Sequence, residues 1–293
     1  MDVVITYVNG LDPVWGKEYE KYTNTPILEK RFRDWGTLKY LLRGIETCMP
    51  FIRNVYLVVS GESQVPEWAD TSNLDIVLHK DIIPAEFLPT FNSNTIEMHL
   101  HKIQDLDEEY IYFNDDMFPV GHFLPDDFFC NGKITMGFSH HLLASGMYKK
   151  ICRNSDHLAR KVFGMKPSCR FLRPQHICSP MLKSECEKLY GVAEPEIRQT
   201  LSVTRTENNL TQYLFLDYMY YNGTAIPRKL SKKHFSMAAA TPRQISSFIQ
   251  NPSRKLVCIN DVNLSEEQYE KMRKAITEAF EKRFPSPSHF EKC

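Results

Sequence analysis

Apolar runs that end in turn signals alternate with amphipathic segments along the first half of the chain. The runs are rich in valine, isoleucine, leucine and tyrosine, and they predict buried strands over residues 3–8, 55–59, 74–78 and 110–113. Leucines and isoleucines at helical spacing predict helices between them, over 38–49 and 96–103. Strands separated by helices predict an α/β fold with a mostly parallel sheet and flanking helices, in which ligands bind at the carboxyl ends of strands.

The second half of the chain has a weaker pattern. Residues 121–191 are rich in His, Cys, Pro and Phe, which indicates an inserted, less regular, lid-like subregion. Beyond it the pattern predicts a helix over 211–221, a strand over 255–259, and a long helix after Ser265, where Ser265 and Gln268 form a capping box. No internal repeat or low-complexity linker interrupts the sequence, so we expect a single domain over residues 1–293.

Charge and composition narrow the classes of function. The 293 residues include 36 basic and 36 acidic side chains, and this balance argues against a broad nucleic-acid-binding surface. No apolar run has the length needed to cross a bilayer, and the first residues lack the basic start of a secretory signal. We therefore expect a cytoplasmic protein with reduced cysteines.

Four of the eight cysteines crowd a region that also contains two histidines: Cys152, Cys169, Cys178 and Cys186, with His157 and His176. A structural zinc site is one interpretation of this cluster. Because the spacing is irregular and contains no CxxC pair, scattered reduced thiols are the simpler interpretation.

One predicted strand ends in an amide and two adjacent carboxylates. The strand over 110–113 runs directly into Asn114, Asp115 and Asp116. Paired acids at the end of a buried strand are costly unless a cation or several donors compensate them. Hard oxygen ligands in this position suit Mg²⁺ or Mn²⁺ bridging diphosphate oxygens, whereas a solvated Asn-Asp turn is the alternative.

A second strand end repeats the same form near the other end of the chain. The strand over 255–259 ends in Asn260 and Asp261, so that the two acidic ends can converge on one cation. The competing interpretation is that Asp261 only forms the turn before the helix that follows.

Two arginines precede the helix predicted over 38–49. Arg31 and Arg33 match phosphate oxygens bidentately, and a helix start adds its positive dipole end. A surface cluster paired to Asp34 and Glu29 is the alternative.

Three further segments hold polar candidates. The stretch that includes Asn92 leads into the predicted helix of Glu97 and His101. These two residues are four apart and so share one face of that helix. Because the apolar stripe faces the core, we expect their face to point toward a cleft or solvent. His176 lies in a Pro-bounded loop and is a candidate general base. Arg205 is a candidate phosphate contact, as is Arg198, although composition alone does not separate either from a surface residue.

In order and in wording, these segments resemble the four blocks of the Stealth family of hexose-1-phosphate transferases. The four blocks correspond to residues 2–15, 31–116, about 174–221 and 258–291. The second is long and specific, with an Arg-Phe-Arg-Asp start, a Pro-Thr-Phe-Asn-Ser stretch and a Phe-Asn-Asp-Asp end, and the third is looser. The chain has little beyond these blocks, which favours a small bacterial member over the larger animal enzyme that tags lysosomal glycoproteins.

The resemblance implies a nucleotide-sugar-transferase-like fold and a defined reaction. The donor would be a UDP-sugar, and the acceptor would be a carbohydrate or a glycolipid-linked glycan. The enzyme would bind peripherally at the inner face of the membrane. Hexose-1-phosphate would pass to the acceptor hydroxyl with release of UMP, as in capsule or exopolysaccharide synthesis. Such a displacement is catalysed mainly by positioning and charge neutralisation.

The resemblance also implies roles for the candidate residues. Asp115, Asp116 and Asp261 would bind the cation, supported by Asn114 and Asn260. Arg31, Arg33 and Arg205 would neutralise phosphate, and His176 would be the base. The remaining candidates would contact substrate: Asn9, Gly10, Asp12, Asn92 and Glu97.

Two rival functions remain open from the sequence. A metal-dependent glycosyltransferase would use the same metal–diphosphate site but break the sugar C–O bond and release UDP. A non-catalytic carbohydrate-binding protein is a different class, and the density of Asp, Arg and His at strand ends argues against it.

Overall fold

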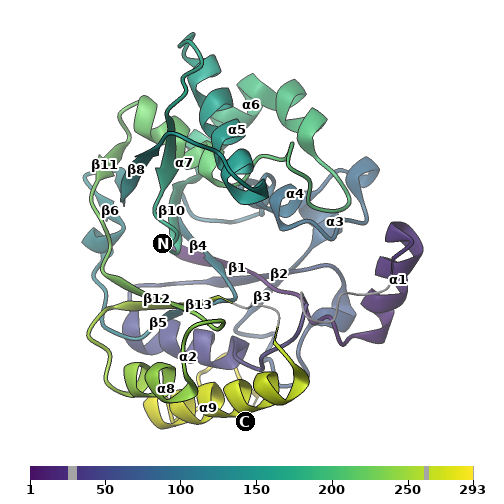
Figure 1. The fold of residues 1–293 in the computed structure, drawn as a ribbon, viewed down its shortest axis with the longest axis vertical. Helices are drawn as coiled ribbons and strands as arrows, with labels where there is room; N and C mark the ends of the chain where they lie inside the picture. Colours follow the sequence, from purple (N-terminus) through teal and green to yellow (C-terminus); the bar gives the residue numbers. More distant parts are fainter. Residues whose placement is uncertain (26–31, 261–263, 293) are drawn as a thin grey trace. The chain divides into compact units, whose positions relative to one another are not determined.

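The computed structural model describes residues 1–25, 32–260 and 264–292 (Figure 1). Its strands, in chain order, are β1 (Asp2–Thr6), β2 (Val55–Val59), β3 (Asp75–Leu78), β4 (Glu109–Asn114), β5 (Met117–Pro119), β6 (Phe129–Cys130), β7 (Lys133–Met136), β8 (Phe138–His141), β9 (Phe171–Pro174), β10 (Ser179–Leu182), β11 (Ala225–Pro227), β12 (Lys232–Ser236) and β13 (Leu256–Asn260). Its helices are α1 (Pro13–Thr23), α2 (Leu38–Cys48), α3 (His79–Ile82), α4 (Ser93–Glu97), α5 (Met147–Val162), α6 (Lys183–Thr200), α7 (Tyr213–Tyr221), α8 (Pro242–Gln250) and α9 (Glu266–Arg283).

The chain divides into two compact units. The first unit comprises Met1–Val4, Val77–Tyr112 and Pro125–Leu230, and the second comprises Ile5–Ile76, Phe113–Leu124 and Ser231–Cys293. The expected insertion, residues 121–191, contains α5 and several short strands, and all but its first four residues fall in the first unit. The organisation of residues 1–293 as one domain stays a prediction.

A five-stranded sheet in the order β10-β4-β1-β2-β3 forms the α/β framework. The sheet is mostly parallel, with β10 antiparallel to β4, and the predicted α/β class is confirmed. Every residue of β2 is buried, as are most of β1 and β4, because strands in the middle of a helix-covered sheet have no solvent face. The continuous apolar runs in the sequence are therefore those of strands buried on both faces of the sheet.

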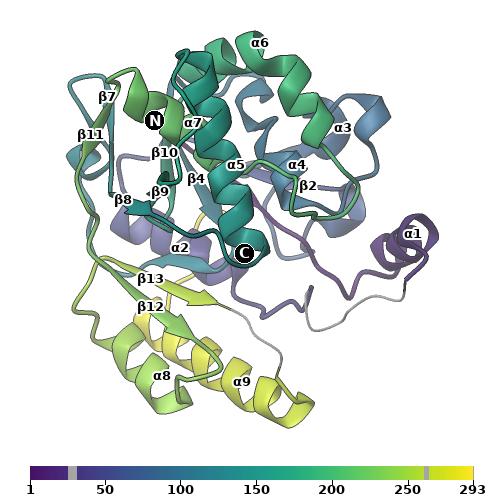
Figure 2. The ribbon, with the colours of Figure 1, turned by 45° about the horizontal axis from the view of Figure 1, so that its top comes forward.

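The second unit adds a small sheet in the order β12-β13-β5, with β12 parallel and β5 antiparallel to β13. Helices α8 and α9 lie side by side near β12 and β13 (Figures 1 and 2). The rings of Phe118 on β5 and Phe280 on α9 pack at 4.7 Å. The predicted capping box is confirmed, because Ser265 caps α9 and exchanges hydrogen bonds with Gln268.

The first unit is built around α7, an apolar helix that packs against α5. The buried carboxylate of Asp156 accepts hydrogen bonds in this core from Arg160 at 2.8 Å and from the Tyr221 hydroxyl at 2.5 Å. The same unit holds the sheet β11-β7-β6 and the pair β8-β9.

The helix expected over 96–103 does not form. Helix α4 ends at Glu97, and a separate 3-10 turn covers Leu100–Lys102. Glu97 and His101 therefore do not share a helical face, and both are buried rather than turned toward a cleft or solvent. Burial lowers the pKa of His101 to about 3, and its ring packs on Tyr190 and Phe215 at 5.0 and 5.7 Å.

The cysteines do not support the zinc interpretation. Cys152, Cys178 and Cys186 are buried, Cys169 is exposed, and none of the four forms a disulfide. Within residues 1–25, 32–260 and 264–292 these four form no cluster able to hold a metal ion. No helix in the described part of the chain is long and apolar enough to span a membrane.

Candidate active site

The turn between β4 and β5 carries the paired carboxylates. Strand β4 ends at Asn114, Asp115 is exposed, and Asp116 is half-buried immediately before β5. The Oδ1 atom of Asp116 is shielded from solvent and has no hydrogen-bond partner among the residues described. Burial raises the pKa of Asp116 to about 6, against the opposing effects of the Cys258 thiol, a backbone amide and the charge of Lys232.

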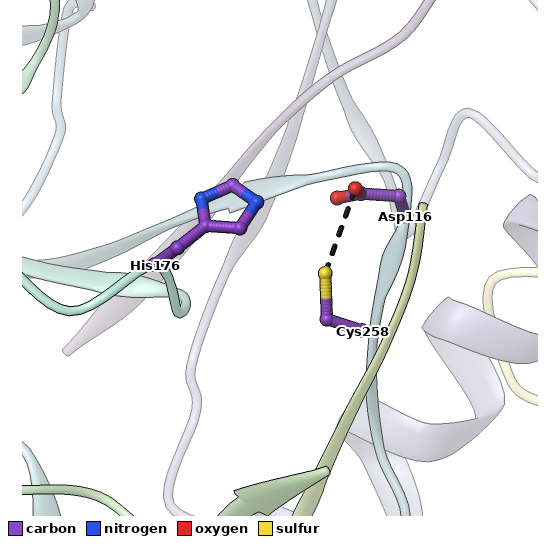
Figure 3. Close-up of side chains that lie close together, drawn as sticks. All are labelled: Asp116, His176 and Cys258. Carbon is purple, nitrogen blue, oxygen red and sulfur yellow. Dashed lines mark hydrogen bonds between the residues drawn. The ribbon is translucent and has the colours of Figure 1, made fainter. Parts of the chain in front are cut away.

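The end of β13 meets this turn through Ile259 and Asn260. The backbone N–H of Ile259 donates to the carbonyl of Asp116 at 2.9 Å, and the Asn260 side-chain nitrogen donates to Asp116 Oδ2 at 3.2 Å. The Cys258 thiol lies 3.6 Å from the same oxygen (Figure 3). It lies 3.2 Å from Asn260 Oδ1. His234 on β12 continues the network through its Nε2 atom, which is hydrogen-bonded to Asn260 Oδ1.

A cavity of about 100 Å³ in the second unit opens beside the acidic turn. Its lining joins segments that are distant in sequence: Tyr7, Arg33, Asp34, Trp35, Thr37, Leu38, Asp115, Asp116, Phe118, Met237, Ile259 and Ile276. Burial raises the pKa of the Tyr7 hydroxyl strongly, and the charge and hydrogen bond of Asp34 and the charge of Asp115 add to the effect. The Tyr7 hydroxyl is therefore buried within reach of the charges of Asp34 and Asp115.

Donor groups of the same cavity come from the segment that follows residue 31. The Arg33 guanidinium donates to Glu266 Oε2 at 2.7 Å and lies 4.4 Å from the centre of the Tyr269 ring. Trp35 stacks edge-on against Tyr269, and its shielded indole Nε1 has no partner in the part of the chain that the structure covers. A buried donor without a hydrogen-bond partner is energetically unfavourable.

The predicted substrate contacts at the end of β1 form their own turn. Gly10 donates its N–H to the Phe32 carbonyl at 2.9 Å, and a Cβ at Gly10 would lie 2.4 Å from that oxygen, so only glycine fits. Asp12 caps α1 and accepts from Ser63 at 2.6 Å and Gln64 at 2.7 Å. Burial opposes ionisation of Asp12, but these hydrogen bonds outweigh it and lower its pKa.

Asn9 is held by the same turn. Its Oδ1 accepts from the Leu11 amide at 2.9 Å, and its backbone N–H donates to Gln64 Oε1 at 2.6 Å. The turn is therefore rigid and internally bonded, and a nucleotide contact by these residues stays a prediction.

In the first unit, Asn92 and Glu97 hold a loop over 200–212. Asn92 caps α4 with its Oδ1 and donates from its Nδ2 to Asn209 at 3.1 Å. Glu97 accepts from the Thr211 hydroxyl at 2.8 Å and the Gln212 amide at 2.9 Å, at the start of α7. Burial raises the pKa of Glu97, while these bonds and the charge of Arg205 oppose the rise. Arg205, in this loop, donates to Ser93.

His176 lies beside a pair of tyrosines in the first unit. Its Nδ1 is 3.2 Å from the Tyr213 hydroxyl, which accepts a hydrogen bond from Tyr148 at 3.0 Å. The His176 ring, drawn in Figure 3, also meets the Tyr148 ring edge to face at 6.4 Å. The Arg173 guanidinium lies 5.1 Å from the centre of that tyrosine ring. The imidazole is therefore oriented by aromatic hydroxyl and ring contacts of its own unit.

The predicted site residues that the structure describes fall in both units. Arg33, Asp115 and Asp116 share one cavity of the second unit, whereas the candidates Asn92, Glu97, His176 and Arg205 belong to the first. Arg31 and Asp261 lie outside the described residues. Sequence reasoning missed Tyr7, Trp35 and Cys258, although each stands inside a segment that the pattern had already singled out.

Comparison with known proteins identifies the family. The profile of Stealth protein CR2, conserved region 2, matches residues 31–136, and that of Stealth protein CR4, conserved region 4, matches residues 247–293. The second and fourth blocks of the resemblance are therefore confirmed.

Relatives that align with the whole chain indicate the same family. A capsular polysaccharide phosphotransferase WcwK of Streptococcus pneumoniae is 30% identical over 332 aligned positions, covering 100% of this chain and 98% of the relative. The capsular polysaccharide phosphotransferase fcs1 of Haemophilus influenzae is 30% identical and covers 92% of this chain and 80% of its own. The exopolysaccharide phosphotransferase cps2G of Lactiplantibacillus plantarum is 28% identical, with coverage of 100% and 96%.

Among solved structures, the galactosyltransferase LgtC in complex with donor and acceptor sugar analogues matches with a TM-score of 0.47 at 10% identity, over 99% of this chain and 98% of that chain. The family profiles and the relatives that align with the whole chain decide the matter: the chain is a transferase that belongs to the Stealth family of polysaccharide phosphotransferases.

Proposed function

We propose that the enzyme transfers a hexose-1-phosphate, for example GlcNAc-1-phosphate, from a UDP-sugar to a carbohydrate hydroxyl in surface polysaccharide synthesis. Family membership supports the sugar-phosphate transfer. One observation carries the assignment of the site: Asp115, Asp116 and Arg33 line the same cavity. Carboxylates for a cation and a guanidinium for phosphate are the two requirements for binding a diphosphate.

The proposed reaction is a displacement at phosphorus. The acceptor oxygen forms a bond to the phosphorus that bears the sugar, and the bond from that phosphorus to the bridging oxygen breaks. The bridging oxygen leaves with UMP, and the acceptor proton passes to a base. The sugar's anomeric C–O bond is untouched, so its configuration is retained in the phosphodiester product. Positioning and charge neutralisation supply most of the catalysis of such a step.

A divalent cation suits the donor set of the acidic turn. Asp116 presents a shielded oxygen without a partner among the residues described, and Asp115 lies beside it on the cavity wall. Asp115, Asp116 and Asp261 would hold Mg²⁺ or Mn²⁺, with Asn114 and Asn260 in support. When bound, the cation would neutralise diphosphate charge.

The other candidates complete the proposed site. Arg31, Arg33 and Arg205 neutralise phosphate, and His176 accepts the acceptor proton. Asn9, Gly10 and Asp12 form a rigid turn for the nucleotide.

Asn92 and Glu97 act as positioning residues in this proposal. Their side-chain hydrogen bonds run to the loop that carries Arg205 and to the start of α7. They would therefore act on the substrate through that loop.

The test follows one phosphorus atom. Enzyme, divalent metal and acceptor are incubated with a panel of UDP-sugars labelled with ³²P in the phosphate that bears the sugar. The proposal expects ³²P in the glycan product and unlabelled UMP. Label that remains in released UDP would indicate a glycosyltransferase, and label that stays in intact donor across the whole panel would indicate a binding protein.

The cellular location is part of the same proposal: the enzyme is cytoplasmic in a bacterium and docks on the inner face of the membrane. Leu142, Leu143 and Met147, between β8 and the start of α5, are 58%, 74% and 47% exposed. Burial and then the charges of Arg173, Lys149 and His140 lower the pKa of His141, so this apolar loop sits in a positive field. Exposed leucines with basic neighbours suit an anionic lipid surface.

The docking is tested by flotation with vesicles. Wild type should float with phosphatidylglycerol vesicles and less with phosphatidylcholine, and a Leu142→Ser/Leu143→Ser variant should stay in solution. Equal flotation of the variant would contradict the proposal.

A further inference from the structure

A second hollow of the second unit is lined by residues of strand β12, of helix α8 and of the segment that joins them. Figure 2 shows this strand and helix as neighbours in the ribbon. The volume of the hollow is about 680 Å³, and it is open to solvent. The residues that line this groove are Lys233, His234, Phe235, Ser236, Ala239, Ala240, Arg243, Gln244, Ser247, Phe248 and Asn251.

The groove is basic. Lys233 and Arg243 are exposed on opposite walls, one on the strand and one on the first turn of the helix. None of the lining residues, all of them described, carries a carboxylate, and neither cation forms an ion pair with any residue in the described ranges. Two uncompensated positive charges across a hollow attract an anion.

The rest of the lining suits a sugar. The rings of Phe235 and Phe248 meet edge to face at 5.6 Å, and the Lys233 ammonium lies 5.1 Å from the centre of the Phe235 ring. Ser247 and Asn251 supply polar groups along the helix wall. Aromatic carbon receives the C–H face of a hexose, while hydroxyl and amide groups meet its hydroxyls.

The groove is joined to the acidic turn by a short chain of contacts. His234 lines the groove and is hydrogen-bonded to Asn260, which in turn donates to Asp116 at 3.2 Å. In the parallel pairing of β12 with β13, His234 lies opposite Cys258. Two successive hydrogen bonds of the same unit therefore connect the groove wall to Asp116.

We propose that this groove binds the acceptor, and that the acceptor is a glycan that carries phosphate charge recognised by Lys233 and Arg243. The inference rests on the proposed function for the identity of the acceptor, but the groove itself is separate from the donor cavity. Two sources supply the same chemistry: an internal phosphodiester of the glycan, or a diphosphate at its reducing end.

Binding of three tetrasaccharides by calorimetry separates these sources. One probe is neutral, one contains an internal phosphodiester, and one carries a reducing-end diphosphate. Wild type should bind at least one charged probe about ten-fold or more tightly than the neutral probe, and the advantage should shrink as added salt screens the charges. The charged probe that binds better identifies the source.

Charge reversal tests the residues. Lys233→Glu/Arg243→Glu should remove the preference for charge without lowering the melting temperature. The matched control, Lys271→Glu/Lys274→Glu, reverses two exposed lysines of α9 and should bind like wild type. Wild type that binds neutral and charged probes equally would overturn the proposal, as would a folded groove variant with unchanged preference.

The two proposals fail separately. If ³²P passes from donor to glycan but the groove variant keeps the preference for charge, the groove proposal is wrong and the transferase proposal stands. If no donor yields labelled glycan while charged-probe binding still requires both cations, the groove stands as an anionic-glycan site and the transfer proposal is wrong. UDP binding in the presence of metal should be the same in both variants and wild type, because it reports the donor cavity alone.

Discussion

Asn260 donates a hydrogen bond from its side-chain nitrogen to Asp116 Oδ2 at 3.2 Å, and so fixes one oxygen of that carboxylate from the end of β13. The other oxygen, Oδ1, is shielded and has no partner in the described part of the chain. A carboxylate held on one side and unsatisfied on the other is oriented for a ligand. Substitution of Asp116 and substitution of Asn260 should therefore affect catalysis in different ways.

Asp116→Asn should lower kcat by about a thousand-fold or more, because it deletes a charge that would bind the cation. The fold should remain, and the melting temperature should hold or rise without metal, since a costly buried carboxylate is gone. Turnover and thermal melting measure the two effects. Asp126→Asn, an exposed acid in another turn, is the control, and near-normal turnover of Asp116→Asn would remove the acidic turn from the mechanism.

Asn260→Ala should act on metal affinity instead. Outer-shell partners orient metal ligands, and their loss typically weakens metal binding about 10–100-fold. The Mg²⁺ or Mn²⁺ concentration for half-maximal rate should rise by that factor, while the rate at saturating metal stays within a few-fold of wild type. An unchanged metal requirement would mean that the bond to Asp116 is only structural.

Arg33→Lys should lower kcat/KM by about ten-fold or more, because lysine keeps the charge but loses the bidentate fork. Its exposed partner offers a matched control: Glu266→Gln removes the ion pair and leaves Arg33 on the cavity wall. That variant should keep its kcat/KM. Equal losses in the two variants would assign Arg33 to the ion pair with α9 rather than to phosphate.

Much of the fold could be predicted from local pattern. The strand over 55–59 has the predicted bounds, and Ser265 begins α9 as its capping box indicates, because turn chemistry and apolar runs are local signals. The helix over 96–103 failed for a tertiary reason. Glu97 turns inward to accept from the start of α7, and a bond made across 115 residues leaves no trace in sequence periodicity.

The candidate site was likewise predictable only where the signal is local in the sequence. The acids at the end of β4 stood out because paired carboxylates after an apolar run are rare without a function. Trp35 and Cys258 could not be recognised, because each resembles an ordinary core residue until the cavity and the contact with Asp116 are seen. The contacts of Asn92 and Glu97 were equally hidden, since both resemble exposed polar residues in the sequence.

Acid should destabilise the protein through its buried histidines. Burial lowers the pKa of His79 to about 4, of His99 to about 4 and of His101 to about 3, against about 6.5 when unfolded. The unfolded chain therefore binds more protons below pH 6.5, and stability falls as pH drops from about 6.5 toward 4. Each such group contributes a slope of about 1.4 kcal/mol per pH unit to the free energy of unfolding.

His101→Phe isolates one of these groups. Phenylalanine keeps the packing on Tyr190 and Phe215 but cannot be protonated. The difference in bound protons between the unfolded and folded states should therefore fall by about one, and the slope of the unfolding free energy with pH should fall with it. Urea unfolding between pH 7 and 4.5 measures it. The raised pKa values of Asp116 and Glu97 act in the opposite direction, so the comparison is the difference between variant and wild type rather than the absolute slope. Parallel curves would show that His101 does not titrate with unfolding.

His176→Ala tests the general base. The acceptor hydroxyl must lose its proton as it attacks phosphorus, and neutral imidazole suits that step near pH 7. Because a loose transition state needs little base assistance, the loss of kcat should be about a hundred-fold. UDP affinity in the presence of metal should barely change. Weak UDP binding with kcat preserved would instead make His176 a donor contact and direct the search for the base to Asp34.

The pH profile and a neighbouring variant decide between a base and a structural residue. A histidine base must be neutral, so the wild-type rate should fall where imidazoles are protonated, near pH 6 to 7, and this acid limb should be absent from His176→Ala. Tyr213→Phe removes the hydroxyl that lies 3.2 Å from His176 Nδ1 and should shift that limb and lower kcat by about ten-fold while the imidazole remains. Since Tyr213 reaches the substrate only through His176 in this scheme, the double variant should be no slower than His176→Ala alone. Losses that multiply would place the two side chains in independent roles.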